Sequence, residues 1–389
     1  MSDLDKHPNK YSRLRSIYKY YIDSFIALYQ LKTKDEEDLN SIYKIIKTEL
    51  IDSMKYPPQN FIRSILSIIP YNNRYTMSYL KLIKFIYDDY HVKEVRNIVN
   101  IFNFMFYKEY GIKLDNSSDF EDIKSENLII HSENTIYRAI IDNNLEKFIL
   151  FTECDEFDEN QKLNSSLFPF SNAEYSLLEV CCYYGAVDCF KLLRTKFKST
   201  ITEICLDFSF LCGNQEIMSE CLKYQRPDNY SMKYAIISHN IDFVTFLTNE
   251  YNIEIDLEYC GIYKNLDALL VYYDQTNNVD KCILYSALFE IPCLCEYFLS
   301  LGANINEKND LGETALIFAA DFNYIEMIEF LILHGANINE KNNQGEIALH
   351  YAADNNHKEM AELLISHGAN INEKDENGKT ALHYTVEKK

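Results

Sequence analysis

The sequence predicts an all-α protein in which helix pairs stack on one another, and three observations predict this fold. Glycines recur at one fixed step in two series, Gly302, Gly335, Gly368 and Gly312, Gly345, Gly378. Apolar residues between these glycines are spaced by three and four, which is the period of an amphipathic helix. Glycine and proline are scarce in the chain, as suits a helical protein.

Each repeat is interpreted as a helix, a tight turn, a second helix and a projecting loop. The first helix begins at Thr-Ala-Leu in residues 314–316 and 380–382, where threonine is a suitable N-cap. The second helix carries an apolar stripe that includes Met327, Ile328 and Leu331. Glycine follows that helix because the chain there requires a positive φ. Each repeat can bury its apolar face only against its neighbours, so the repeats must stack.

These repeats resemble the ankyrin repeat, which has the same period and the pattern T-P-L-H, A-A, L-L and H-G-A-x-I-N. Alanine replaces the proline in all three repeats, and Ile317 replaces the first histidine, whereas His350 and His383 keep it. The chain ends just after the first helix of the last repeat, which is therefore truncated. The resemblance implies an ankyrin-type solenoid of helix pairs, in which these histidines make hydrogen bonds that join neighbouring repeats.

Weaker versions of the same repeat extend upstream. One position recurs between the two helices of each pair, three residues before an acidic residue of the second helix or its equivalent. Its occupants, in chain order, are Asn143, Gly185, Gly213, His239, Lys264, Glu290, Asn323 and Asn356. The last two steps in this series equal the glycine step, the four before them are shorter, and the first is longer. The shorter steps hold two helices but leave little room for a projecting loop.

The length predicts roughly two to three domains. We expect a helical N-terminal domain of unknown function at 1–114, an acidic linker or loop at 115–132, shortened and degenerate helix pairs at 133–300, and ankyrin repeats at 301–389. This layout resembles a group of protist ankyrin-repeat proteins with a conserved, uncharacterised N-terminal helical region. The phrases YPPQNFI, IIPYNNRYT, FYKEYGIKLD and CCYYGAVDCFKLLR carry that resemblance.

Charge and composition exclude several classes of partner. The formal net charge of −21 repels nucleic acid, and no run of Lys or Arg builds a basic face. No apolar run approaches the ~18 residues of a membrane span, and the polar start is not a signal peptide. The odd number of cysteines, 11, fits reduced thiols in a cytoplasmic or nuclear compartment. We therefore expect neither nucleic-acid binding nor membrane insertion.

No residue pattern indicates an enzyme, a cofactor or a metal site. Cys181 and Cys182 occupy the position of the Ala-Ala pair, where a buried cysteine acts as a small apolar residue. Histidines one repeat apart lie on helices roughly 8–10 Å apart, too far to share a zinc ion. Motifs for phosphate binding, serine hydrolases and metalloproteases are absent from the sequence.

The resemblance instead implies protein binding through loop tips and the exposed side of the first helix. Carried over to this chain, the partner-binding residues are Asp310, Leu311, Glu313, Asp321, Phe322, Asn343, Gln344, Glu346, Asp354, Asn355, Glu376, Asn377 and Lys379. Among them Phe322 is the best anchor, because an exposed aromatic ring contributes more than a carboxylate. The expected function is a non-enzymatic scaffold for another protein. The alternative is an adaptor whose N-terminal domain recruits a ubiquitin-ligase or cytoskeletal complex.

Overall fold

The computed structural model describes residues 10–96, 98–117, 119–120, 123, 132–169 and 173–387. Most of the predicted linker, 115–132, lies outside these residues. The described chain is helical apart from one short antiparallel pair of strands, β1 (Lys162–Asn164) with β2 (Glu174–Ser176). The predicted all-α repeat fold is therefore confirmed. The strand pair falls within the long step between Asn143 and Gly185, which explains the extra length of that step.

The chain forms two compact units. The 18–254 unit runs from Tyr18 to Glu254, and the C-terminal unit joins the first helix to the chain from Ile255 onward. The 18–254 unit begins with α2 (Lys19–Tyr29), α3 (Glu36–Ile45), the π-helix η1 (Ile46–Ser53), α4 (Pro58–Ile68), the 3-10 turns η2 (Ile69–Tyr71) and η3 (Asn73–Tyr75), α5 (Thr76–Asp89) and α6 (Asn100–Tyr110). Its helix pairs are α7 (Ile136–Ile141) with α8 (Leu145–Thr152), α9 (Leu177–Tyr184) with α10 (Val187–Lys196), α11 (Glu203–Cys212) with α12 (Gln215–Cys221), and α13 (Asn229–Ile237) with α14 (Ile241–Tyr251).

The C-terminal unit consists of the first helix and four helix pairs followed by a single helix. The elements are α1 (Lys10–Ile17), α15 (Leu257–Ile262), α16 (Leu266–Thr276), α17 (Val279–Ser286) with η5 (Ala287–Phe289), α18 (Pro292–Ser300), α19 (Ala315–Asp321), α20 (Ile325–Leu333), α21 (Ala348–Asp354), α22 (Lys358–Ser366) and α23 (Ala381–Glu387). Helix α1 packs on α16, where the Tyr11 hydroxyl donates to Asp267 at 2.7 Å and Arg15 lies 3.3 Å from the same carboxylate. The division into four domains proposed above stays a prediction.

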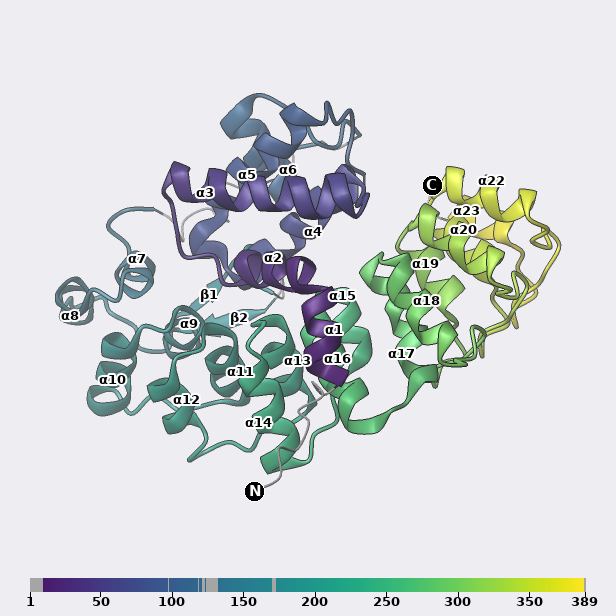
Figure 1. The fold of residues 1–389 in the computed structure, drawn as a ribbon. Coiled ribbons are helices and arrows are strands. Elements are labelled where there is room, and N and C mark those ends of the chain that lie inside the picture. The colour runs from purple at the N-terminus through teal and green to yellow at the C-terminus, as the bar shows by residue number, and fades with distance from the viewer. Residues whose placement is uncertain are drawn as a thin grey trace, which may run out of the picture. The chain divides into compact units, whose positions relative to one another are not determined.

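Within each unit the helix pairs stack in chain order (Figure 1). The first helices of successive pairs contact one another, from α7 through α9 and α11 to α13, and again from α15 through α17, α19 and α21 to α23. The second helix of each pair packs against its own first helix. Buried apolar side chains such as Ala319, Ile328, Leu331 and Ala352 fill the seams between pairs. The small alanines allow the close approach that the sequence predicts.

All eight residues placed between paired helices have positive φ, with values from 47° to 73°. They are Asn143, Gly185, Gly213, His239, Lys264, Glu290, Asn323 and Asn356. In several pairs the next N–H closes the turn on the carbonyl five residues back, as Tyr324 does with Ala319 at 2.8 Å. This is the Schellman ending of a helix, and it places the second helix against the first.

Buried cysteines occupy the small positions in these seams. Cys181 and Cys182 on α9 are completely buried, and eight of the eleven cysteines are buried in all. Burial raises the pKa of the Cys181 and Cys182 thiols well above its usual value, so both stay protonated. Their interpretation as apolar packing residues agrees with this environment.

Candidate functional site: the C-terminal turn tips

The projecting loops of the C-terminal unit end in three turns of the same design. In each turn a backbone N–H donates a hydrogen bond to the carbonyl of the residue four positions later. Asn309 donates to Glu313 at 3.0 Å, and Asn342 donates to Glu346 at 2.9 Å. The side chains repeat this bond, because Asn309 Nδ2 donates to Glu313 at 2.8 Å and Asn342 Nδ2 to Glu346 at 2.9 Å. The third turn uses Asp375 in place of asparagine. We call these three turns, at residues 309–313, 342–346 and 375–379, the turn tips.

Each turn tip is bonded to the next. Asn343 N donates to Leu311 O at 2.9 Å, and Glu376 N donates to Gln344 O at 2.8 Å. The glycines of the first two tips are needed for this approach: a Cβ on Gly312 would lie 2.7 Å from the backbone nitrogen of Asn343, and a Cβ on Gly345 would lie 3.0 Å from that of Glu376. The tips therefore form one continuous row of backbone.

Tyrosines on the first helices add a second tie between repeats. The Tyr351 hydroxyl donates to Glu313 Oε1 at 3.0 Å, and the Tyr384 hydroxyl donates to Glu346 Oε1 at 2.7 Å. Burial and the neighbouring carboxylates raise the pKa of Tyr351, so its hydroxyl keeps the proton that it donates. The sequence carries a signal for this tie, since the two tyrosines are one repeat apart and so are the two glutamates. This tie was not among the features predicted from the sequence.

The loop bases carry a third set of ties, made of charged and amide side chains. Lys308 pairs with Glu340 at 2.6 Å, and Lys341 pairs with Glu373 at 2.7 Å. The lysine in each pair holds the pKa of its glutamate below the usual value. These pairs are partly exposed to solvent, so each contributes little to the stability of the stack.

The thirteen predicted binding residues divide into two groups in the structure. Exposed at the turn tips are Asp310, Leu311, Asn343, Gln344, Glu376 and Asn377. Half-buried are Glu313, Asp321, Phe322, Glu346, Asp354, Asn355 and Lys379. Several members of the second group hold neighbouring repeats together, as Asn355 does by donating to Asp321 Oδ1 at 2.8 Å.

Phe322, expected as an exposed anchor, is only partly accessible. Its ring stacks on Tyr324, with ring centroids 5.7 Å apart and planes at 22°. Its side chain also packs against the apolar core of the repeats. Leu311, with 62% of its surface exposed, is the apolar side chain that protrudes at the turn tips.

The two repeat histidines differ from what the resemblance implies. His350 Nδ1 accepts from the N–H of Ile347 at 3.1 Å, and His383 Nδ1 accepts from the N–H of Thr380 at 3.1 Å. Each imidazole therefore caps the start of its own helix. The contact to the next repeat is a ring contact, with His350 edge-on to Tyr384 at 5.5 Å.

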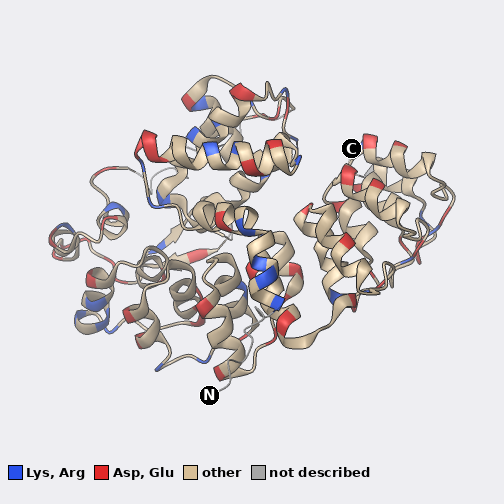
Figure 2. Ribbon diagram, viewed as in Figure 1, with Lys and Arg blue, Asp and Glu red and all other residues tan. Residues whose placement is uncertain are grey.

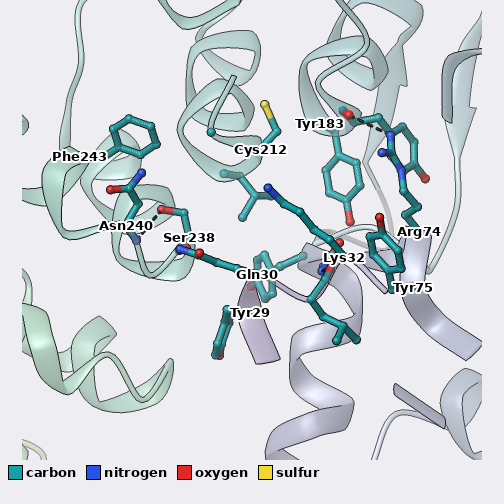
Figure 3. Close-up of a pocket in the computed structure, with 16 residues that line it drawn as sticks. Tyr29, Gln30, Lys32, Arg74, Tyr75, Tyr183, Cys212, Ser238, Asn240 and Phe243 are labelled. Carbon is teal, nitrogen blue, oxygen red and sulfur yellow. Dashed lines mark hydrogen bonds between the residues drawn. The ribbon is translucent and has the colours of Figure 1, made fainter. Parts of the chain in front are cut away.

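A cavity of about 240 Å³ in the 18–254 unit lies outside the predicted site (Figure 3). Its walls come from the end of α2, the turns η2 and η3, and the C-terminal ends of α9, α11 and α13. Gln30 Nε2 donates to the carbonyls of Ser238 and His239, both at 3.1 Å, and Arg74 Nη2 donates to Tyr184 O at 2.9 Å. The helices before the repeats therefore dock on the turns between paired helices.

Other kinds of site are not found in the part of the chain that the structure describes. No group of three or more His, Cys, Asp or Glu residues there could hold a metal ion. None of the described helices combines the length and the apolar character that a membrane crossing requires.

Comparison with known families decides what these repeats are. A family described as Ankyrin repeats (3 copies) matches residues 264–342, 283–375 and 333–389. Residues 264–389 are ankyrin repeats. A second family, Domain of unknown function (DUF3447), matches residues 197–272, which include α11 to α15. The ankyrin match begins upstream of residue 301, at the turn between α15 and α16. A comparison with curated proteins found no match.

Ankyrin repeats are generally protein–protein interaction modules. The turn tips fit that chemistry, because they present amides, carboxylates and one leucine on a rigid row. Backbone bonds and the tyrosine ties hold this row in one conformation.

Proposed function

We propose that the chain is a non-enzymatic scaffold that binds another protein through the turn tips and the adjoining first-helix face of its ankyrin repeats. The observation that carries this proposal is that two residues of the tips, Leu311 and Gln344, hold the next tip through their backbone carbonyls and leave their side chains exposed. A rigid surface with protruding side chains suits recognition of a folded partner.

A reducing compartment, the cytoplasm or the nucleus, is part of the proposal. All eleven cysteines are free, and most are buried in the seams between helices. Disulfides are rare in such compartments, where thiols are kept reduced. The compartment can be tested by localising a fluorescently tagged full chain in its native cell.

The binding surface is tested by affinity purification with quantitative mass spectrometry. The test variant carries Leu311→Ser and Gln344→Ala, which remove exposed side chains and leave the backbone ties in place. The matched control is Leu333→Ser, because Leu333 is 80% exposed but lies at the end of α20, on the second helix of its pair. We expect the test variant to lose partners that the wild type and the control retain. Retention of every partner by the test variant would refute the proposed surface.

A further inference from the structure

A second hollow in the 18–254 unit has a charge opposite to that of the whole chain. This groove, of about 650 Å³, is lined by α3, α5, α6 and α7 and by the segments before α3 and α5. Its cations are Lys34, Arg74, Lys81, Lys108 and Arg138, against two carboxylates, Glu36 and Glu109. We call it the basic groove. The chain as a whole carries a formal charge of −21.

Three of these cations are not neutralised by a carboxylate within the described residues. Lys81 pairs with Glu36 at 3.2 Å, and Arg138 pairs with Asp142 at 2.8 Å. Lys34 and Lys108 are exposed and have no such pair among the described ion pairs. Arg74 donates Nη2 to the Tyr184 carbonyl, which is neutral, and lies over the Tyr184 ring at 5.4 Å.

The first turn of α5 adds to the positive potential. Residues 76–78 at this end of the 14-residue helix line the groove, and the N-cap Tyr75 offers no side-chain acceptor to their N–H groups. The N-terminal end of a helix carries a partial positive charge that favours anions. Arg74 and Tyr75 also line the neighbouring cavity of Figure 3, which contains Lys32 and no carboxylate.

Part of the groove's lining is apolar, and we call this part the apolar floor. Leu39 is buried there, Met105 is partly buried, and Met77 is 49% exposed. An inorganic anion has no group that would use this floor, whereas a peptide side chain does. A groove with an apolar floor and a few placed charges is typical of a site that binds an organic ligand.

The short range of electrostatic forces favours a short acidic peptide over a long nucleic acid as the ligand of the groove. At physiological ionic strength charges are screened over about 8 Å. A short acidic segment in the groove therefore responds mainly to the local cations. A long polyanion would also come close to the acidic residues that are interspersed with basic ones over α3 to α6 (Figure 2).

We propose that the basic groove binds an acidic peptide segment of a partner protein. Carboxylates of the segment pair with Lys34, Arg74 and Lys108, and an apolar side chain covers Leu39 and Met105. This binding goes beyond the function proposed for the turn tips. The groove and the tips are built from different helices, so failure of one proposal leaves the other standing.

The proposal is tested by fluorescence anisotropy with the full chain and the labelled peptide Glu-Asp-Glu-Leu-Asp-Glu. We expect saturable binding that weakens as NaCl rises from about 50 to about 500 mM. The variant Lys34→Glu with Lys108→Glu should bind at least about tenfold more weakly, because attraction becomes repulsion. The control Lys147→Glu reverses an exposed charge on α8, outside the groove, and should bind as the wild type does.

Four outcomes would overturn the proposal. They are no saturable binding, equal binding of the neutral peptide Gln-Asn-Gln-Leu-Asn-Gln, unchanged affinity in the double variant, and tighter binding of a hexathymidine oligonucleotide than of the acidic peptide. The last outcome would assign the groove to nucleic acid. Circular dichroism of both variants separates a loss of affinity from a loss of fold. Replacing the leucine of the peptide by glycine should lower affinity, and equal affinity would contradict the role of the apolar floor.

Discussion

A buried ion pair links two consecutive repeats, and its removal gives the sharpest test of the stack. Lys264 Nζ lies 3.1 Å from Glu290 Oε1, and the two side chains are only 4% and 7% exposed. Lys264 also donates to the Leu288 carbonyl and, at 2.9 Å, to the Tyr324 hydroxyl. Both charged residues have positive φ, 58° and 59°, which is unfavourable for a side chain with a Cβ. The pair therefore lies at two turns whose backbone conformation is unfavourable for the residues that occupy them.

The variant Lys264→Met keeps much of the length of the side chain and removes its charge. The carboxylate of Glu290 then stays buried without its cation, which lowers the free energy of unfolding by about 3–5 kcal/mol. Adding Glu290→Gln removes the uncompensated charge, so the double variant should regain about 1–3 kcal/mol of the loss. Because the pair is buried, the loss should change little between low and high salt.

The assay is urea unfolding followed by circular dichroism, with stability taken from the midpoint and the slope. Lys198→Met is the matched control, because Lys198 also has a positive φ, 56°, but is exposed. We expect the control to lie within about 0.5 kcal/mol of the wild type. If Lys264→Met costs no more than this control, or if Glu290→Gln recovers nothing, the ion pair does not hold these repeats together.

Three further predictions test other parts of the fold. Burial raises the pKa of Asp207 to about 7, so stability should fall as pH rises from about 4 to 7, where the unfolded state loses its proton first. The whole loss in the free energy of unfolding is roughly 4 kcal/mol, and it should be absent in Asp207→Asn. If the urea midpoints at pH 5 and pH 8 differ by the same amount in the wild type and in Asp207→Asn, the prediction is wrong. Gly261→Ala should lower the free energy of unfolding by about 1–3 kcal/mol, although alanine has the better helix propensity, because the added Cβ would lie 2.5 Å from Leu288 Cβ. A melting temperature above that of the wild type would refute this prediction. Tyr351→Phe should lower stability by about 1 kcal/mol in thermal unfolding by removing the bond to Glu313, and an unchanged melting temperature would show that the tie is weak.

The sequence is sufficient to predict the repeats because their turns demand a backbone that few residues tolerate. In the clear repeats Asn323 and Asn356 mark this position by residue type, since asparagine accepts positive φ more readily than most residues. Upstream the same position also holds Lys264 and Glu290, which carry no such signal. Only alignment by the spacing of the helices finds them.

The basic groove and the position of α1 could not be predicted, because both depend on contacts between distant segments. The groove gathers cations from Lys34 to Arg138, and no two of them are close enough in sequence to form a run. Helix α1 buries Leu14 and bonds Asp267 through Tyr11, although Asp267 lies far away along the chain. Local periodicity indicates that a face must be covered without indicating which segment covers it.

The three turn tips also show where recognition can vary without loss of the stack. Gly312 and Gly345, together with the pairs Tyr351–Glu313 and Tyr384–Glu346, hold one repeat to the next. The position before each glycine is different: it holds Leu311, Gln344 and Asn377 in turn, and all three side chains are exposed. In the first two tips that residue contributes only its backbone carbonyl to the next tip, so the stack places no demand on its side chain. Selection for a partner can therefore act on this position independently of stability, which is why we expect the variant of Leu311 and Gln344 to lose binding while remaining folded.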